Sequence, residues 1–396
     1  MSGFASSSLA RAALSRLFEP SDTVGLGLVS LVGPVDALRV ARREIGTGHE
    51  LTRHLCEALG VGERPNLLEE GLARWAPRLG DLAPERDLAT LARLGGRLVV
   101  PESEEWPEAL DDLQVSAPLC LWVRGRHQVP GIERLAALVG SRDSTTYGSS
   151  VTTDLASGLT ARGFTVVSGG AYGIDAQAHR AALATTDDRD APATIALLAS
   201  GVDRYYPAGN EELLRAIAER GLLISEVPPG SSPTRWRFLQ RNRLIAALSA
   251  VTVVVEARWR SGALNTAHHA GELGRPVGAV PGSVQSANSA GCHRLLRDGT
   301  AVCVTDAADV AELARPLGGE SGDSARDEAS PARDHDGLTI PDLLLLDGLP
   351  VRASTSVDKL SSVAGLSTKD VIGGLARLEL AGLAQRSADG WRRQKG

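Results

Sequence analysis

A series of short, uninterrupted apolar runs occupies the middle of the sequence, and each run is followed by a polar or glycine-rich turn and then by an amphipathic stretch. Strands that are apolar at every position are buried on both faces, as in a parallel sheet covered by helices on each side. Alternation of such strands with helices is typical of doubly wound α/β domains. We therefore predict a Rossmann-like, mostly parallel sheet with strands at residues 135–139, 164–167, 194–199, 222–225, 251–255 and 277–280.

The whole chain has 396 residues, which are too many for one ordinary core. Its composition predicts further domains on both sides of the α/β sheet. Residues 1–82 have Leu, Ala, Arg and Glu at helical spacing and predict a small helical domain, SAM-like or helix-hairpin-helix-like, before the α/β domain at 83–316. Residues 317–336 are polar and acidic, which predicts a flexible linker. Residues 337–396 show two helices joined by a tight turn and then a two-stranded wing, which predicts a winged helix-turn-helix domain.

Charge is distributed unevenly along the sequence. The formal net charge of −6 argues against a protein covered by basic surface, yet nine basic and three acidic residues lie between Arg235 and Thr300. This basic segment predicts an anionic ligand. The chain has no run of eighteen uncharged apolar residues, no apolar N-terminal segment of secretory type and no C-x-x-C pair among its four cysteines. We therefore expect a cytoplasmic protein with reduced thiols and no membrane span.

The predicted strands carry glycine, serine and arginine at their carboxyl ends, where open α/β sheets bind ligands. Glycine turns let the backbone approach a ligand, and their N–H groups bind phosphate together with the start of the next helix. Arginines near the start of a helix oppose its dipole and need an anion, which is either a phosphate or a structural partner, Glu226 or Glu256. The predicted DNA- or phosphate-binding residues are Gly140, Ser141, Arg142, Ser168, Gly169, Gly170, Tyr172, Gly173, Arg241, Asn242, Arg243, Ser261 and Gly262.

Other chemistry finds little support in the sequence. The dinucleotide fingerprint G-x-G-x-x-G is missing from the glycine turns, and no acidic residue ends the second strand to hold a ribose. His268 and His269 are adjacent, so they point to different faces of a helix and do not form a metal clamp. Asp175 and His179 lie on one helix face without a nearby nucleophile, so we interpret them as structural partners. We expect no catalytic residue, no cofactor and no metal.

Several longer motifs occur in a characteristic order. They are GSR at 140–142, SGGAYGIDAQAHRAAL at 168–183, GVDRYYPAGN at 201–210, FLQRNRLIAALS at 238–249 and EARWRSGALNTAHHA at 256–270. In residues, order and spacing, the chain resembles the DNA-processing protein A (DprA/Smf) family over about residues 107–310.

The resemblance implies a cytoplasmic, non-enzymatic protein that binds single-stranded DNA as a homodimer and helps to load the RecA recombinase during natural transformation. It assigns the DNA pocket to Arg142, the turn at 168–173, residues 241–243 and the turn at Ser261 and Gly262. Tyr172 and Ala208 stand where family members commonly carry basic residues. Tyr172 is open to two interpretations, stacking on a base or packing within the protein.

Two other functions use the same features. A nucleotide-cleaving enzyme of the phosphoribohydrolase type would combine the phosphate turns with a carboxylate, for which Glu226, Glu256 and Asp175 are the candidates. A transcription regulator would read duplex DNA with its winged helix and sense a nucleotide with its α/β domain.

Overall fold

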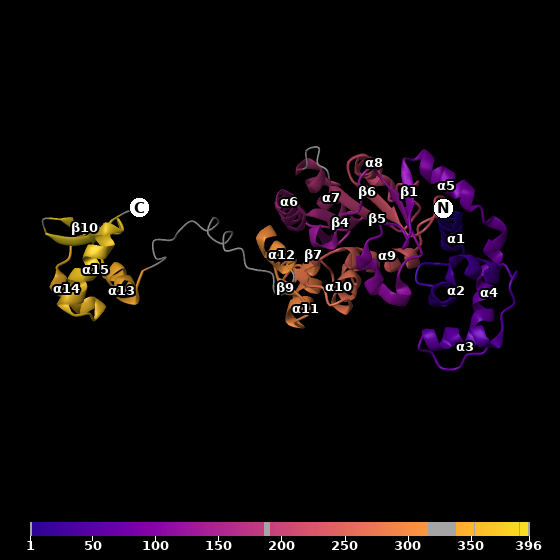
Figure 1. The fold of residues 1–396 in the computed structure, drawn as a ribbon. Helices are drawn as coiled ribbons and strands as arrows, with labels where there is room; N and C mark the ends of the chain where they lie inside the picture. Colours follow the sequence, from indigo (N-terminus) through magenta and orange to yellow (C-terminus); the bar gives the residue numbers. More distant parts are fainter. Residues whose placement is uncertain (1, 186–190, 316–337, 352, 388, 395–396) are drawn as a thin grey trace. The chain divides into compact units, whose positions relative to one another are not determined.

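The computed structural model describes residues 2–185, 191–315, 338–351, 353–387 and 389–394, which fall into two compact units (Figure 1). The division between the units falls within residues 316–337. The predicted linker, residues 317–336, therefore lies outside the described residues.

A nine-stranded sheet forms the centre of the first unit, with the strand order β1-β2-β6-β5-β4-β3-β7-β8-β9. Neighbouring strands from β6 to β9 are parallel, whereas β2 is antiparallel to both β1 and β6. The predicted α/β sheet is confirmed, and β3 to β8 are the predicted strands. The bounds are β1 (Gly96–Val99), β2 (Leu121–Arg124), β3 (Leu135–Gly140), β4 (Thr165–Gly169), β5 (Thr194–Leu198), β6 (Leu222–Ser225), β7 (Val251–Glu256), β8 (Val277–Ala279) and β9 (Val302–Cys303).

Helices cover both faces of this sheet. Leu135, Ala137 and Val139 of β3 lie in a hydrophobic core with α9, α10 and α11, whereas Ala136 and Leu138 lie in another core with α6, α7 and α12. A strand between two helical layers is buried on both faces, which explains its continuous apolar sequence. The helices are α6 (Thr146–Ala161), α7 (Ile174–Thr185), α8 (Glu211–Arg220), α9 (Arg235–Leu248), α10 (Ala263–Glu272), α11 (Ala290–Arg297) and α12 (Ala307–Leu313), with short 3-10 helices at Ile132–Arg134, Ala208–Asn210 and Ala287–Ser289.

The N-terminal helices share a hydrophobic core with one edge of the sheet, so residues 1–82 are not a separate compact unit. Their apolar side chains pack with Trp122 of β2 and Leu223 of β6, and Trp122 Nε1 donates to Ser15 Oγ at 3.2 Å. The helices are α1 (Ser2–Leu17), α2 (Thr23–Ala41), α3 (His49–Ala58), α4 (Leu67–Trp75) and α5 (Pro84–Arg93), with 3-10 helices at Ala76–Asp81 and Glu108–Ser116.

Among the described residues, one helix is long and apolar enough to cross a membrane. This is α2, whose mean hydropathy is 1.6. Half of it is buried, and it contributes to the N-terminal core, while Gly33 (φ 77°) interrupts it just before Pro34. A core helix of a globular protein meets the same criterion of length and composition, so α2 is weak support for a membrane span.

In its described residues, the second unit contains three helices followed by a two-stranded antiparallel sheet. Val371, Leu375 and Leu378 are fully buried on one face of the longest helix, and Ser367 caps its start by accepting from Asp370 N at 3.2 Å. This element order matches the predicted winged helix, whose identification remains a prediction. The elements are α13 (Ile340–Gly348), α14 (Val357–Ala364), α15 (Thr368–Leu380), β10 (Ala384–Ser387) and β11 (Gly390–Arg393).

Candidate nucleic-acid interface

The chain reverses its direction across the sheet between β3 and β7. From β3 it continues through β4, β5 and β6 to one side, whereas β7, β8 and β9 lie on the other side. Ligands of open α/β sheets bind outside the carboxyl ends of the strands at such a point. A cavity of about 310 Å³ lies there, and we call it the DNA cavity after the ligand that the sequence predicts for it. The predicted site residues that line it are Gly140, Ser141, Arg142, Arg241, Asn242, Ser261 and Gly262.

Two exposed arginines lie at the rim of the DNA cavity. Arg142 follows β3, and its guanidinium lies 5.1 Å from the centre of the Phe238 ring. Arg260 follows β7 and was not singled out in the sequence. In the part of the chain that the structure describes, neither forms an ion pair, whereas Arg258, which lines the same cavity, is held by Asp143 at 2.6 Å. Arg142 and Arg260 therefore keep their hydrogen-bond donors for an anion from outside.

Arg241 lies at the floor of the same cavity and is only 6% exposed. Its Nη1 donates to the carbonyl of Leu197 at 2.8 Å, but its buried Nε has no hydrogen-bond partner among the described residues. Burial lowers the pKa of Arg241 and raises the pKa of neighbouring Asp175, and each charge partly offsets the shift of the other. An anion in the cavity would stabilise this incompletely compensated cation.

Arg243 has a structural role rather than the predicted contact with phosphate. Its Nη1 and Nη2 donate to both carboxylate oxygens of Glu226 at 2.8 and 2.6 Å, and it is 3% exposed. Its Nε and Nη1 also donate to the carbonyls of Ser116 and Gln240. Of the two alternatives that the sequence left open for this arginine, the structure shows the ion pair with Glu226.

Asn242 supports the turn that begins α10. Its Nδ2 donates to the carbonyl of Gly262 at 3.3 Å and to Asn265 Oδ1 at 3.2 Å. Ser261 Oγ accepts from the backbone N of Ala263 within the same turn. Asn242 thus fixes one wall of the DNA cavity from within the protein.

The glycines of the turn after β4 make close contacts with neighbouring parts of the protein rather than with the cavity. Gly173 has a φ of 74°, and a Cβ there would overlap the carbonyl oxygen of Ser141. A Cβ on Gly169 would overlap the guanidinium of Arg241. Ser168 is fully buried and donates to the carbonyl of Leu138, while Gly170 accepts from Asn210 Nδ2. These residues therefore lie behind the residues that line the cavity. The sequence had predicted that they contact the phosphate directly.

Aromatic side chains extend the rim of the DNA cavity. Phe238 lines the cavity and lies 5.8 Å from the ring of Tyr206, which is 48% exposed. Tyr172 is 46% exposed, and its hydroxyl accepts from Gly209 N at 3.2 Å. Phe238 and Tyr206 were inside motifs that the sequence showed, but neither was selected as a site residue. Exposed rings beside cations are what single-stranded nucleic acid binds, because every base has a face that can stack.

The buried His179 holds the turn behind the cavity. His179 Nε2 donates to the carbonyl of Gly169 at 2.8 Å, and its Nδ1 lies 2.7 Å from Thr194 Oγ1. Burial lowers the pKa of His179 to about 4, so the ring is neutral at physiological pH. These contacts agree with the interpretation of His179 as a structural residue.

Comparison with known proteins identifies the family to which the chain belongs. The family described as DNA recombination-mediator protein A matches residues 97–315, which include the whole DNA cavity. This chain belongs to that family. A DNA processing protein DprA of Mycobacterium tuberculosis is 43% identical over 391 residues, covering 96% of this chain and 92% of the relative. The protein Smf of Escherichia coli is 35% identical, covering 75% and 77%.

A solved structure agrees with the fold of this family member. The crystal structure of DNA processing protein A from Streptococcus pneumoniae superposes with a TM-score of 0.57 at 28% sequence identity. The match covers 76% of this chain and 94% of that structure. The resemblance stated from the sequence motifs is therefore confirmed at the level of the family.

Proposed function

We propose that this chain binds single-stranded DNA, without sequence specificity, in the DNA cavity. The observation that carries this proposal is one cavity lined by three arginines whose donors are not all used among the described residues: the buried Arg241, whose Nε has no partner there, and the exposed Arg142 and Arg260, which form no ion pair there. Three cations around one cavity suit the phosphates of a strand, and the rings of Phe238 and Tyr206 suit its bases. Asn242, an amide able to read base edges, is already occupied within the protein.

The family resemblance extends this proposal beyond the cavity. It supports a cytoplasmic homodimer that helps to load the RecA recombinase onto the bound strand in DNA uptake and recombination. A binding protein of this kind needs no cofactor, no metal and no catalytic residue. Membrane attachment has no part in this proposal.

The placement of the carboxylates favours binding over nucleotide cleavage. Glu226 is held by Arg243, and Glu256 accepts from the backbone N and Oγ1 of Thr145 at the start of α6. Glu256 also faces a separate cavity of about 550 Å³ rather than the DNA cavity. Asp175 is the one candidate that lines the DNA cavity, and it lies buried beside Arg241.

The proposal predicts the behaviour of a double variant, Arg142→Ala with Arg260→Ala. Affinity for oligo-dT should fall at least about tenfold, and the slope of log affinity against log salt should decrease by about 1.4, because two phosphate contacts are lost at about 0.7 each. Fluorescence anisotropy over a salt series measures both quantities. Duplex DNA of the same length should bind the parent more weakly.

A matched control removes two other exposed arginines, Arg53 and Arg297, whose side chains are 56% and 69% exposed. It changes the net charge equally and should retain most of the affinity. If the rim variant binds oligo-dT as tightly as this control, the DNA cavity is not the binding site.

A further inference from the structure

A larger cavity, of about 580 Å³, lies between the N-terminal helices and the start of α9. We call it the N-terminal groove; it is lined by residues 19–24, which include the start of α2, by α4, by Arg64 and Arg78, and by Trp236. Trp236 precedes by two residues Phe238, which lines the DNA cavity. The first turn of α9 therefore contributes to both cavities. A DNA strand that reaches from one cavity to the other needs to cross only this helix end, which is about 10–12 Å wide.

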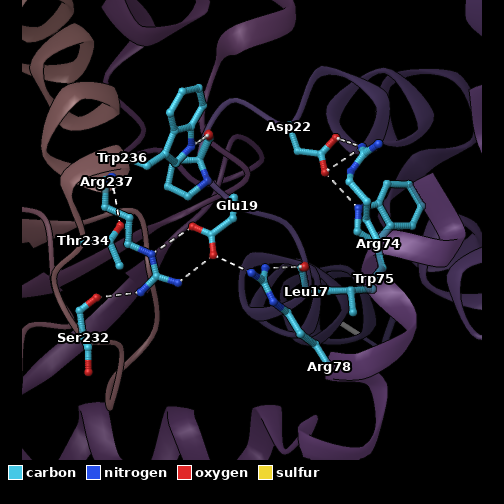
Figure 2. Close-up of polar contacts among 11 residues, drawn as sticks. Leu17, Glu19, Asp22, Arg74, Trp75, Arg78, Ser232, Thr234, Trp236 and Arg237 are labelled. Atoms are coloured by element: carbon cyan, nitrogen blue, oxygen red, sulfur yellow. Dashed lines mark hydrogen bonds and ion pairs between the residues drawn. The ribbon is translucent and has the colours of Figure 1, made fainter. Parts of the chain in front are cut away.

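Trp236 offers an aromatic surface to the N-terminal groove. Trp236 is 51% exposed, although its Nε1 already donates to the carbonyl of Pro20 at 3.3 Å (Figure 2). Because the one polar atom of the Trp236 side chain is already hydrogen-bonded, the exposed part of this side chain is apolar ring surface. Stacking on a nucleobase would bury that surface without requiring a particular base.

The groove also presents guanidinium groups. Arg74 Nη2 donates to both carboxylate oxygens of Asp22, at 3.0 and 3.2 Å, while its other nitrogens have no acceptor among the described residues (Figure 2). The Asp22 side chain is 11% exposed and the Arg74 side chain 51%, so the cation faces solvent and the carboxylate faces the protein. The other lining carboxylates, Glu19 and Glu70, are likewise paired with arginines. Pairing reduces their repulsion of a phosphate.

Glu19 fixes the start of α9 against the N-terminal helices. Its carboxylate accepts from Arg237 at 2.9 and 3.0 Å and from Arg78 at 2.6 Å (Figure 2). Burial raises the pKa of Glu19, but both arginines outweigh this effect and hold the pKa below its usual value. The carboxylate is therefore charged at neutral pH, and its ion pairs hold the helix end that carries Trp236.

We propose that the N-terminal groove binds a second segment of the same single strand, with Trp236 stacked on a base and Arg74 donating to a phosphate. The inference rests on the proposed function, because the DNA cavity holds the first segment. Short oligonucleotides fill the DNA cavity alone, whereas longer ones also reach the groove.

The test compares oligo-dT of about 6 and about 20 nucleotides, bracketing the site sizes of single-strand-binding domains. Trp236→Ala should weaken the long oligonucleotide about tenfold, the effect of losing one stacked base, and leave the short one unchanged. Trp236→Phe keeps a ring and should recover much of the affinity. If Trp236→Ala binds the long oligonucleotide like the parent, the proposal is overturned. Equal weakening of both lengths also overturns it, because Trp236 would then merely support α9.

Arg74→Ala provides an independent measurement in the same groove. The salt slope for the long oligonucleotide should decrease by about 0.7, one phosphate contact, with no change for the short one. Arg53→Ala is the matched control, since Arg53 is 56% exposed and also paired, with Glu57. An unchanged salt slope for the long oligonucleotide in Arg74→Ala would contradict the proposed contact between Arg74 and a phosphate. The Arg142 and Arg260 variant still decides the DNA cavity separately, so failure of the groove and failure of the proposed function are distinguishable.

Discussion

The arginines on α9 and the arginines on the neighbouring turns differ in environment although they lie in one region. Arg241 and Arg243 are 6% and 3% exposed and donate to acceptors inside the protein. Arg142 and Arg260 are exposed and form no ion pair within the described residues. A buried guanidinium must be compensated in place because its desolvation is costly, whereas an exposed one stays available to a ligand. Arg243 therefore serves stability and the two exposed arginines serve binding, whereas Arg241, which lines the DNA cavity and whose Nε has no partner among the described residues, contributes to both.

The largest effect should come from Arg243→Ala. It leaves Glu226, whose side chain is 11% exposed, without its partner, and removing one member of a buried pair costs about 3–5 kcal/mol. The free energy of unfolding, from urea denaturation followed by tryptophan fluorescence, should fall by this amount. The fraction that remains folded should bind oligo-dT like the parent.

Removing both charges controls for this result. The variant Arg243→Met with Glu226→Leu leaves no unpaired carboxylate and should recover much of the lost stability. A stable Arg243→Ala variant that had lost DNA affinity would instead make Arg243 a ligand contact, as the sequence predicted, and would end the division between Arg243 and the exposed arginines.

The protein should also become less stable in acid because of His179. Its folded pKa, about 4, lies below the ordinary value of 6.5, so the unfolded chain binds a proton first as the pH falls. Stability is therefore complete above about pH 6.5 and decreases down to about pH 4, by about 3 kcal/mol at 1.36 kcal/mol per unit. Urea denaturation at a series of pH values measures this loss.

A His179→Gln variant isolates that contribution. Its amide can still donate to the carbonyl of Gly169, but it does not titrate, so its stability should depend less on pH in this interval. Asp175 acts in the opposite direction, since burial raises its pKa and its protonation in acid relieves an unfavourable charge. Parallel curves for parent and variant would mean that His179 does not cause the loss.

The fold could be predicted where burial leaves a pattern in the sequence. Strands β3 to β8 are apolar along their length because helices cover both faces. Strand β1 is mostly half-buried and includes Gly96 and Arg97, and β9 has two exposed residues, so neither shows that pattern. The core shared by residues 1–82 and the sheet edge depends on long-range packing, which composition does not reveal.

The site could be predicted by location but not by the role of each arginine. Glycine turns and strand ends identified the correct edge of the sheet, because parallel strands bring their carboxyl ends together. Whether Arg243 meets Glu226 or a phosphate depends on how the β6–α9 loop folds, and sequence spacing does not determine that. Arg260 was part of a recognised motif, yet only the structure shows that it lines the cavity while Arg258 beside it is paired.

The smallest effect on stability should come from the rim. Arg260→Ala removes an exposed side chain without an ion pair among the described residues, so the free energy of unfolding should change by less than about 0.5 kcal/mol. Arg142→Ala also loses the contact with the Phe238 ring, worth about 0.5–1 kcal/mol at an exposed site. Urea denaturation should thus show both variants nearly as stable as the parent, while DNA affinity falls. A rim variant that lost several kcal/mol would show that these arginines are structural too, and the cavity would then have no exposed arginine set aside for its ligand.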